Sequence, residues 1–137
     1  MNFKFSNSTK IILVTGCFIA SVTGFLVKLP SAFHHIDKEL HFAFYFLAAT
    51  FLNVLFNATS LLKHLLIAVI LFLFGIGIEF AQENYNKLFH VRIHGRFDPE
   101  DVKANLRGLI AFSIVWAVVM LVRLALRSSK KTSERAE

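Results

Sequence analysis

Ionisable and polar side chains recur at helical spacing near the start of one apolar stretch. Asp37, His41 and Tyr45 are four residues apart in turn, so a helix would place them on one face, and Lys38 is near enough to join them. A carboxylate beside an imidazole raises its basicity and fixes its orientation. This face predicts a general base or a ligand for a polar headgroup. A structural role stays open, with Asp37 capping the helix and Tyr45 in an interfacial aromatic belt.

A further carboxylate follows a long uncharged run. Glu79 comes after fourteen uncharged residues, 65–78, and Gln82 and Glu83 share its helical face. A carboxylate so placed needs a proton or an ionic partner, which predicts an acid–base group or a buried ion pair at Glu79. Glu83 is equally consistent with a helix leaving the membrane. Gly75 and Gly77 would permit close helix approach on this side.

The third group of polar residues opens the last apolar stretch. Asp98 before Pro99 predicts a helix N-cap, with Asp101 as the acid of a capping box. Asp101, Asn105 and Gly108 then form a polar stripe with a glycine gap, which we expect to face other helices. A purely structural role stays open for Asn105, as a hydrogen-bond partner between helices. Arg96 could pair with a carboxylate or bind a phosphate. Arg92 is the alternative to Arg96 as the arginine of the site.

Three histidines, His41, His90 and His94, raise the question of a metal. His90 and His94 would meet on one face only if their segment were helical, and Gly95 does not favour a helix. The sequence contains no phosphate-binding glycine loop, no H-E-x-x-H motif and no serine nucleophile motif. We therefore predict neither a metal nor a cofactor.

The composition of the chain that carries these groups indicates a membrane. Its 137 residues suffice for one domain, and they are 55% hydrophobic with 16 Phe, too apolar for a soluble protein of this size. With 6 Gly, 2 Pro and 1 Cys, collagen-like and disulfide-rich classes are excluded. The net charge of +6 does not indicate nucleic acid, because the basic residues are not interleaved with aromatics on a soluble face.

Four stretches are long enough to cross a bilayer core of about 30 Å as helices. They cover residues 11–29, 39–56, 61–82 and 99–126. We predict an all-α bundle of four transmembrane helices as a single domain, 1–126, followed by a disordered basic tail, 127–137. Lipid modification of Cys17 after a cleaved signal is the alternative for the first stretch. It is disfavoured because the run before Cys17 is short and the sequence after it stays apolar.

Charge is distributed unevenly between the two sides of such a bundle. Eight Lys and Arg fall on the side of the termini and seven on the other, a weak topology signal. The side of the polar loop holds seven of the nine acids and five of the six histidines, namely His34, His35, His41, His90 and His94. Basic residues there are expected to pair with these acids. We therefore predict cytoplasmic termini and an extracytoplasmic loop, 83–104, in a multi-pass protein of the cell membrane.

Taken in order, the three groups resemble the VanZ-like family of membrane proteins, named after a teicoplanin-resistance protein. The motifs are Asp37-Lys38-x-x-His41-x-x-x-Tyr45, Glu79-x-x-Gln82 and Arg96-x-Asp98-x-x-Asp101-x-x-x-Asn105-x-x-Gly108. The resemblance covers residues 37–108. It implies a four-span protein of the cell envelope. The resemblance indicates membership of the family more firmly than it indicates a biochemical activity.

Two functions of different classes stay open. The first is binding of an anionic lipid or glycopeptide-related headgroup, with a role in glycopeptide resistance. Its ligand-binding residues would be Lys38, His41, Tyr45, Gln82, Arg96, Asp98, Asp101 and Asn105. The second is an intramembrane enzyme acting on a lipid-linked substrate, with His41, Asp37 and Glu79 as its catalytic groups. A proton-linked transporter is disfavoured, because four short spans offer no pair of discontinuous helices.

Overall fold

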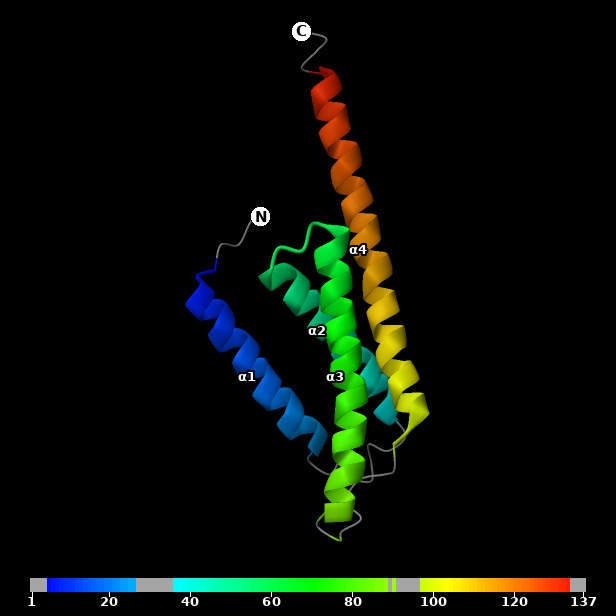
Figure 1. Ribbon diagram of the computed structural model, residues 1–137. Helices are drawn as coiled ribbons and strands as arrows, with labels where there is room; N and C mark the ends of the chain where they lie inside the picture. Colours follow the sequence, from blue (N-terminus) through cyan, green and yellow to red (C-terminus); the bar gives the residue numbers. More distant parts are fainter. Residues whose placement is uncertain (1–4, 27–35, 89, 91–96, 134–137) are drawn as a thin grey trace.

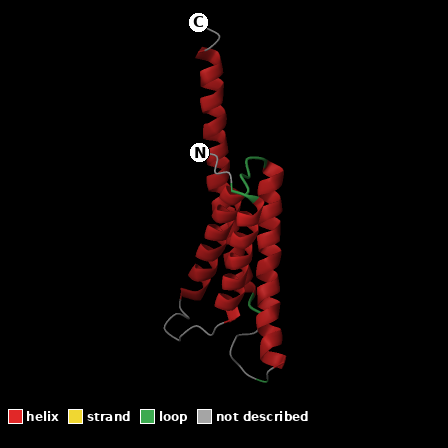
Figure 2. Ribbon diagram, turned by 90° about the vertical axis from the view of Figure 1, so that its left-hand side faces the viewer, coloured by secondary structure: helices red, strands yellow, loops and turns green. Residues whose placement is uncertain are grey.

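The computed structural model describes residues 5–26, 36–88, 90 and 97–133, and within these all regular secondary structure is helical (Figure 2). The helices are α1 (Asn7–Leu26), α2 (Asp37–Leu55), α3 (Leu61–Leu88) and α4 (Pro99–Ser133). Successive helices run in opposite directions, so the start of α1 and the end of α4 lie toward the same end of the molecule (Figure 1). The predicted all-α class is confirmed.

Three of these helices are long and apolar enough to cross a membrane: α1, α3 and α4, over Asn7–Phe25, Leu61–Leu88 and Pro99–Lys130. They suggest a multi-pass membrane protein. In α2, charged residues occupy the first turn and polar residues interrupt the apolar sequence. Those polar residues, His41, Tyr45 and Asn53, are buried, whereas Leu47 and Val54 are exposed. α2 therefore directs these three polar side chains inward while some of its apolar side chains, such as Leu47 and Val54, face outward.

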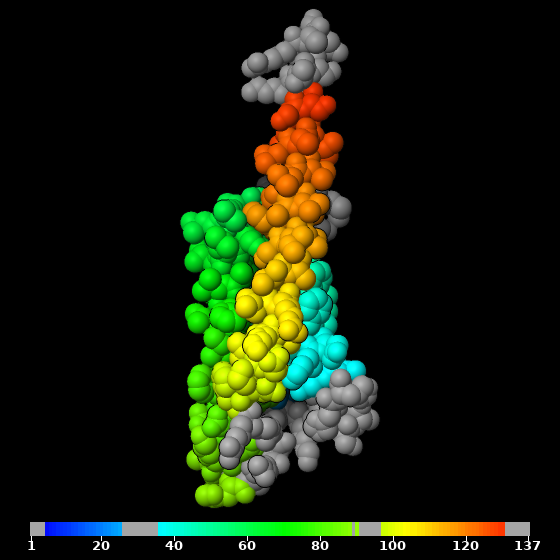
Figure 3. All heavy atoms as spheres, turned by 90° about the vertical axis from the view of Figure 1, so that its right-hand side faces the viewer, coloured from blue at the N-terminus to red at the C-terminus, as the bar shows by residue number. Residues whose placement is uncertain are grey.

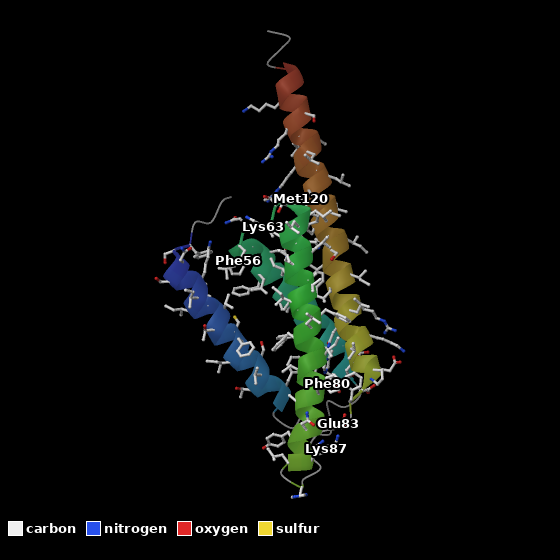
Figure 4. All side chains as sticks on the ribbon, viewed as in Figure 1. Phe56, Lys63, Phe80, Glu83, Lys87 and Met120 are labelled. Carbon is white, nitrogen blue, oxygen red and sulfur yellow. The ribbon has the colours of Figure 1, made fainter. Side chains whose placement is uncertain are left out.

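The helix ends differ from the predicted ones for local reasons. α1 begins before Ile11, because Ser6 Oγ accepts a hydrogen bond from the Thr9 N–H at 3.1 Å and caps the helix. Residues 27–29 of the first predicted stretch lie outside the described residues. α2 begins at Asp37 and ends at Leu55. α3 continues past Gln82 to Leu88. Its last turns carry an ion pair of 2.7 Å between Glu83 and Lys87, at one end of the molecule in Figure 4.

The prediction of a disordered tail from residue 127 is wrong over the part that the structure describes. α4 continues to Ser133 and extends beyond the other helices (Figure 1). No Gly or Pro occurs between Arg127 and Ser133 to end the helix. Residues 134–137 lie outside the described part of the chain.

The core lies between α2, α3 and α4. The most extensive contact joins α2 to α4, and Figure 3 shows α4 lying across the face between its two neighbours. Buried residues of the three helices form the core: Tyr45, Ala49, Leu71, Leu109 and Phe112. Gly108 brings α2 and α4 together, because a Cβ at this position would overlap the Phe42 carbonyl oxygen and lie 3.1 Å from the Phe46 nitrogen. α1 packs more loosely, with a ring contact of 5.6 Å between Phe18 and Phe74.

Candidate functional site

Most of the predicted site residues meet at one end of the bundle. The start of α2, the second half of α3 and the start of α4 come together there, since successive helices alternate in direction (Figure 1). We define the polar cluster as Asp37, Lys38, His41, Tyr45, Glu79, Asp98, Asp101 and Asn105. The end of α1 also reaches it, with the Phe25 ring 5.0 Å from the His41 ring.

His41 is held in one orientation by Asn105. His41 is 5% exposed, and its Nδ1 lies 2.9 Å from Asn105 Oδ1. A carbonyl oxygen can only accept, so Nδ1 carries the hydrogen and donates it. His41 Nε2 lies 4.0 Å from Asp37 Oδ1, which is too long for a hydrogen bond. Asp37 does not cap α2: Ile36 takes the N-cap position, without a side-chain hydrogen bond.

Lys38 bridges two carboxylates at the rim of the cluster. Its Nζ lies 3.4 Å from Asp98 Oδ2 and 3.6 Å from Asp101 Oδ1. The Lys38 side chain is 48% exposed, whereas that of Asp101 is buried. Desolvation lowers the pKa of Lys38, but the Asp101 and Asp98 carboxylates outweigh it, so the pKa is raised above its ordinary value. Lys38, placed before the apolar part of α2, is therefore charged at neutral pH.

Glu79 connects α3 to the start of α4. It is 2% exposed, and its Oε2 accepts a hydrogen bond from the Asp98 N–H at 3.2 Å. Asp98 Oδ1 accepts from the Glu100 N–H at 2.8 Å, so the predicted N-cap is confirmed. The predicted capping-box role of Asp101 is wrong. Glu79 takes the Asp98 N–H, and Asp101 lies against Lys38 of α2 instead.

Three buried oxygens of the cluster have no hydrogen-bond partner among the described residues: Tyr45 Oη, Glu79 Oε1 and Asp101 Oδ1. Tyr45 and Asn105 lie directly against Gly75, where a Cβ would come within 2.8 Å of Tyr45 Oη and 2.7 Å of Asn105 Nδ2. Gly75 thus makes room for the ends of two side chains and not for the backbone of another helix. At Gly77, the other glycine of the predicted helix approach, a Cβ would meet nothing within 4 Å.

Several candidates lie apart from the cluster. Gln82 Nε2 donates to the Phe25 carbonyl oxygen at 2.8 Å and ties α3 to α1. His90 is exposed, whereas Arg92, His94 and Arg96 lie outside the described residues. An open depression of about 600 Å³ lies near the end of α3, and none of the predicted site residues lines it; it is formed by Ala81, Asn84, Tyr85, Lys87 and Leu88.

Sequence reasoning missed a second histidine network at the other end of α2 and α3. His64 Nδ1 lies 3.0 Å from Asn53 Oδ1, and its Nε2 lies 3.0 Å from Ser113 Oγ. The His64 ring also stacks on Trp116 with centroids 4.4 Å apart. The available signal in the sequence was the presence of polar residues, Asn53, His64 and Ser113, within apolar stretches. Both imidazole nitrogens have protein partners, so packing alone accounts for this histidine.

The polar cluster also contains a group of potential metal ligands, in which two carboxylates accompany His41 in place of His90 and His94. One ligand atom from each of Asp37, His41 and Asp101 lies within 4.8 Å of the others. The spacing of Asp37 and His41 was the signal for two of the three. Comparison of the chain with protein-family models, curated proteins and solved structures finds no match to any of them.

Proposed function

We propose that this chain is a VanZ-like membrane protein of the cell envelope that binds the anionic headgroup of a lipid or glycopeptide-related ligand at the polar cluster. The supporting observation is the meeting of three helices around buried His41, Glu79 and Asn105, beneath a rim formed by half-exposed Lys38. The family assignment rests on the order of the three motifs in the sequence, which also motivates a role in teicoplanin resistance.

In this proposal α2 is the fourth membrane span. Its polar residues are satisfied against α3 and α4, as His41 is by Asn105 and Asn53 by His64. A span with inward polar groups and outward apolar side chains is compatible with lipid. With four spans both termini lie on one side of the membrane, which we assign to the cytoplasm from the distribution of charge. The segment 83–104 is then extracytoplasmic, and the polar cluster lies at the outer surface of the cell membrane.

Binding at this place depends on an ordered cation. Lys38 is held by Asp98 and Asp101, which limits the positions that its ammonium group can take. A cation held between carboxylates provides specificity as well as attraction. Arg96, two residues before the cap at Asp98, is the second basic residue assigned to the site.

A second candidate is an acid–base enzyme acting on a lipid-linked substrate. The observation in its favour is that Asn105 accepts the hydrogen of His41 Nδ1 and so leaves Nε2 to accept a proton, as a general base requires. Glu79, with one oxygen lacking a hydrogen bond, would be the further acid–base group.

Complementation of a deletion strain separates the two candidates. Binding through the two basic residues predicts that Lys38→Ala and Arg96→Ala lose teicoplanin resistance at normal membrane abundance. Catalysis predicts that His41→Asn and Glu79→Gln lose it, while Lys38→Ala and Arg96→Ala retain most of it. Normal resistance in all four variants would exclude both candidates.

A further inference from the structure

The charges of the polar cluster are a difficulty for any anionic ligand. Four carboxylates, Asp37, Glu79, Asp98 and Asp101, surround one lysine and one histidine. Lys38 is already shared by two of these carboxylates. Like charges repel strongly where water is excluded, and buried carboxylates are normally protonated, paired with a cation or bound to a metal. Among the described residues, the carboxylates of the cluster therefore outnumber its basic groups.

We propose that Asp37, His41 and Asp101 bind a divalent metal cation. Their three ligand atoms lie within 4.8 Å of one another. Metal–ligand bonds of about 2.0–2.6 Å place two ligands of one ion up to about 4–5 Å apart, so one ion can reach all three atoms with small side-chain adjustments. One imidazole and two carboxylates suit Mn²⁺ and related first-row cations.

The orientation of His41 is an independent argument for a cation. Because Nδ1 donates to Asn105, a neutral imidazole has its lone pair on Nε2. That lone pair faces the Asp37 carboxylate at 4.0 Å, without a hydrogen bond between them. Two electron-rich atoms in this position are stabilised by a positive charge between them, which a proton on Nε2 or a bound cation can supply. Metal-bound histidines commonly donate their other N–H to an oxygen, as His41 does to Asn105.

Buried oxygens without a hydrogen-bond partner among the described residues support the same assignment. Asp101 is 8% exposed, and its Oδ1 accepts no hydrogen bond from any described residue. Glu79 Oε1 is also without one, and Glu79 lies close enough to His41 and Asp101 to interact electrostatically with both. A cation bound by Asp101 and His41 would therefore also be attracted by Glu79.

Lys38 is the competing cation. Its ammonium nitrogen lies 3.6 Å from Asp101 Oδ1, one of the proposed ligands, and 3.4 Å from Asp98 Oδ2. The half-exposed Lys38 can keep the contact with Asp98 when a metal occupies the other side of Asp101. Removing this competitor is expected to strengthen metal binding, which distinguishes a metal site from a site that uses Lys38 alone.

A bound cation would bridge the carboxylates to a phosphate of the headgroup. This link rests on the proposed function, whereas the cation site does not. Binding is tested by titrating the purified full chain in detergent with Mn²⁺ alone and measuring free Mn²⁺ by electron paramagnetic resonance. We expect one saturable site per chain, weakened tenfold or more by Asp37→Asn and by Asp101→Asn. Glu39→Gln, an exposed carboxylate in the same helical turn, leaves it unchanged, and Lys38→Ala tightens it.

The absence of saturable Mn²⁺ binding in the folded wild-type chain would overturn the proposal. Equal binding in Asp37→Asn, Asp101→Asn and Glu39→Gln would overturn it as well. If Asp101→Asn fails to fold, Asp37→Asn decides, because Asp37 is only partly buried at the helix end. The titration contains no headgroup ligand. A failure of the proposed function would therefore appear in the resistance assay and leave the titration unchanged.

Discussion

Two histidines of this chain are buried to similar degrees but are satisfied differently. His64 has a protein partner at each ring nitrogen, Asn53 and Ser113. His41 has one such partner, Asn105, and its second nitrogen faces a carboxylate. A histidine that only packs would be expected to resemble His64. The contrast makes His41 a better candidate than His64 for a functional residue, and it makes His64 a matched control.

Gly108 provides the clearest prediction for a single residue. A Cβ there would overlap the Phe42 carbonyl oxygen, and backbone cannot move aside as a flexible side chain can. We expect Gly108→Ala to reduce the free energy of unfolding by about 1–3 kcal/mol by forcing α2 and α4 apart. Gly77→Ala, with no atom within 4 Å of its Cβ, should leave it unchanged or raise it by up to about 1 kcal/mol, because Ala favours a helix more than Gly does. Thermal unfolding in detergent measures both, and equal transition temperatures would contradict the contact.

At the scale of the elements, the sequence predicted the four helices and missed some of their ends. Apolar runs and helical spacing sufficed to place Asp37, His41 and Tyr45 on one face, and Asp98 Oδ1 caps α4 as expected. The bond from the Asp98 N–H to Glu79 was not predictable, because it joins residues 19 positions apart on different helices. The continuation of α4 to Ser133 was not predicted, because the polar composition of residues 127–133 was interpreted as disorder. No Gly or Pro ends the helix in this segment.

Helix α1 is the element whose relation to a membrane can be tested most simply. Cys17 is the single cysteine of the chain and is exposed on α1. None of the membrane-length segment of α1, Asn7–Phe25, is buried against the other helices. If α1 is a retained span, Cys17 faces lipid. We expect a membrane-impermeant maleimide to leave it unlabelled in intact membranes and to label it after solubilisation in detergent. Labelling in intact membranes, or a lipid on Cys17 by mass spectrometry, would contradict this.

At the scale of the whole molecule, the alternating helix directions place the end of α3 and the end of α4 at opposite ends (Figure 1). With cytoplasmic termini, Leu88 is outside and Ser128 is inside. In a Cys17→Ser background, a cysteine at position 88 should be labelled by an impermeant maleimide from outside intact cells. A cysteine at 128 should be labelled only in inverted vesicles. The opposite pattern would reverse the proposed topology and place the polar cluster in the cytoplasm.

The central claim is that the polar cluster is a working site and more than a support for packing. The direct test compares His41→Ala and Glu79→Gln with wild type, and with His64→Ala as the control, in a deletion background. Membrane abundance and teicoplanin susceptibility are scored together. We predict that the two cluster variants accumulate normally and fail to restore resistance, whereas His64→Ala loses resistance only as far as it loses abundance. Disappearance of both cluster variants from the membrane would contradict the claim, since breaking a buried ionic network destabilises by about 3–5 kcal/mol and would then account for the cluster entirely.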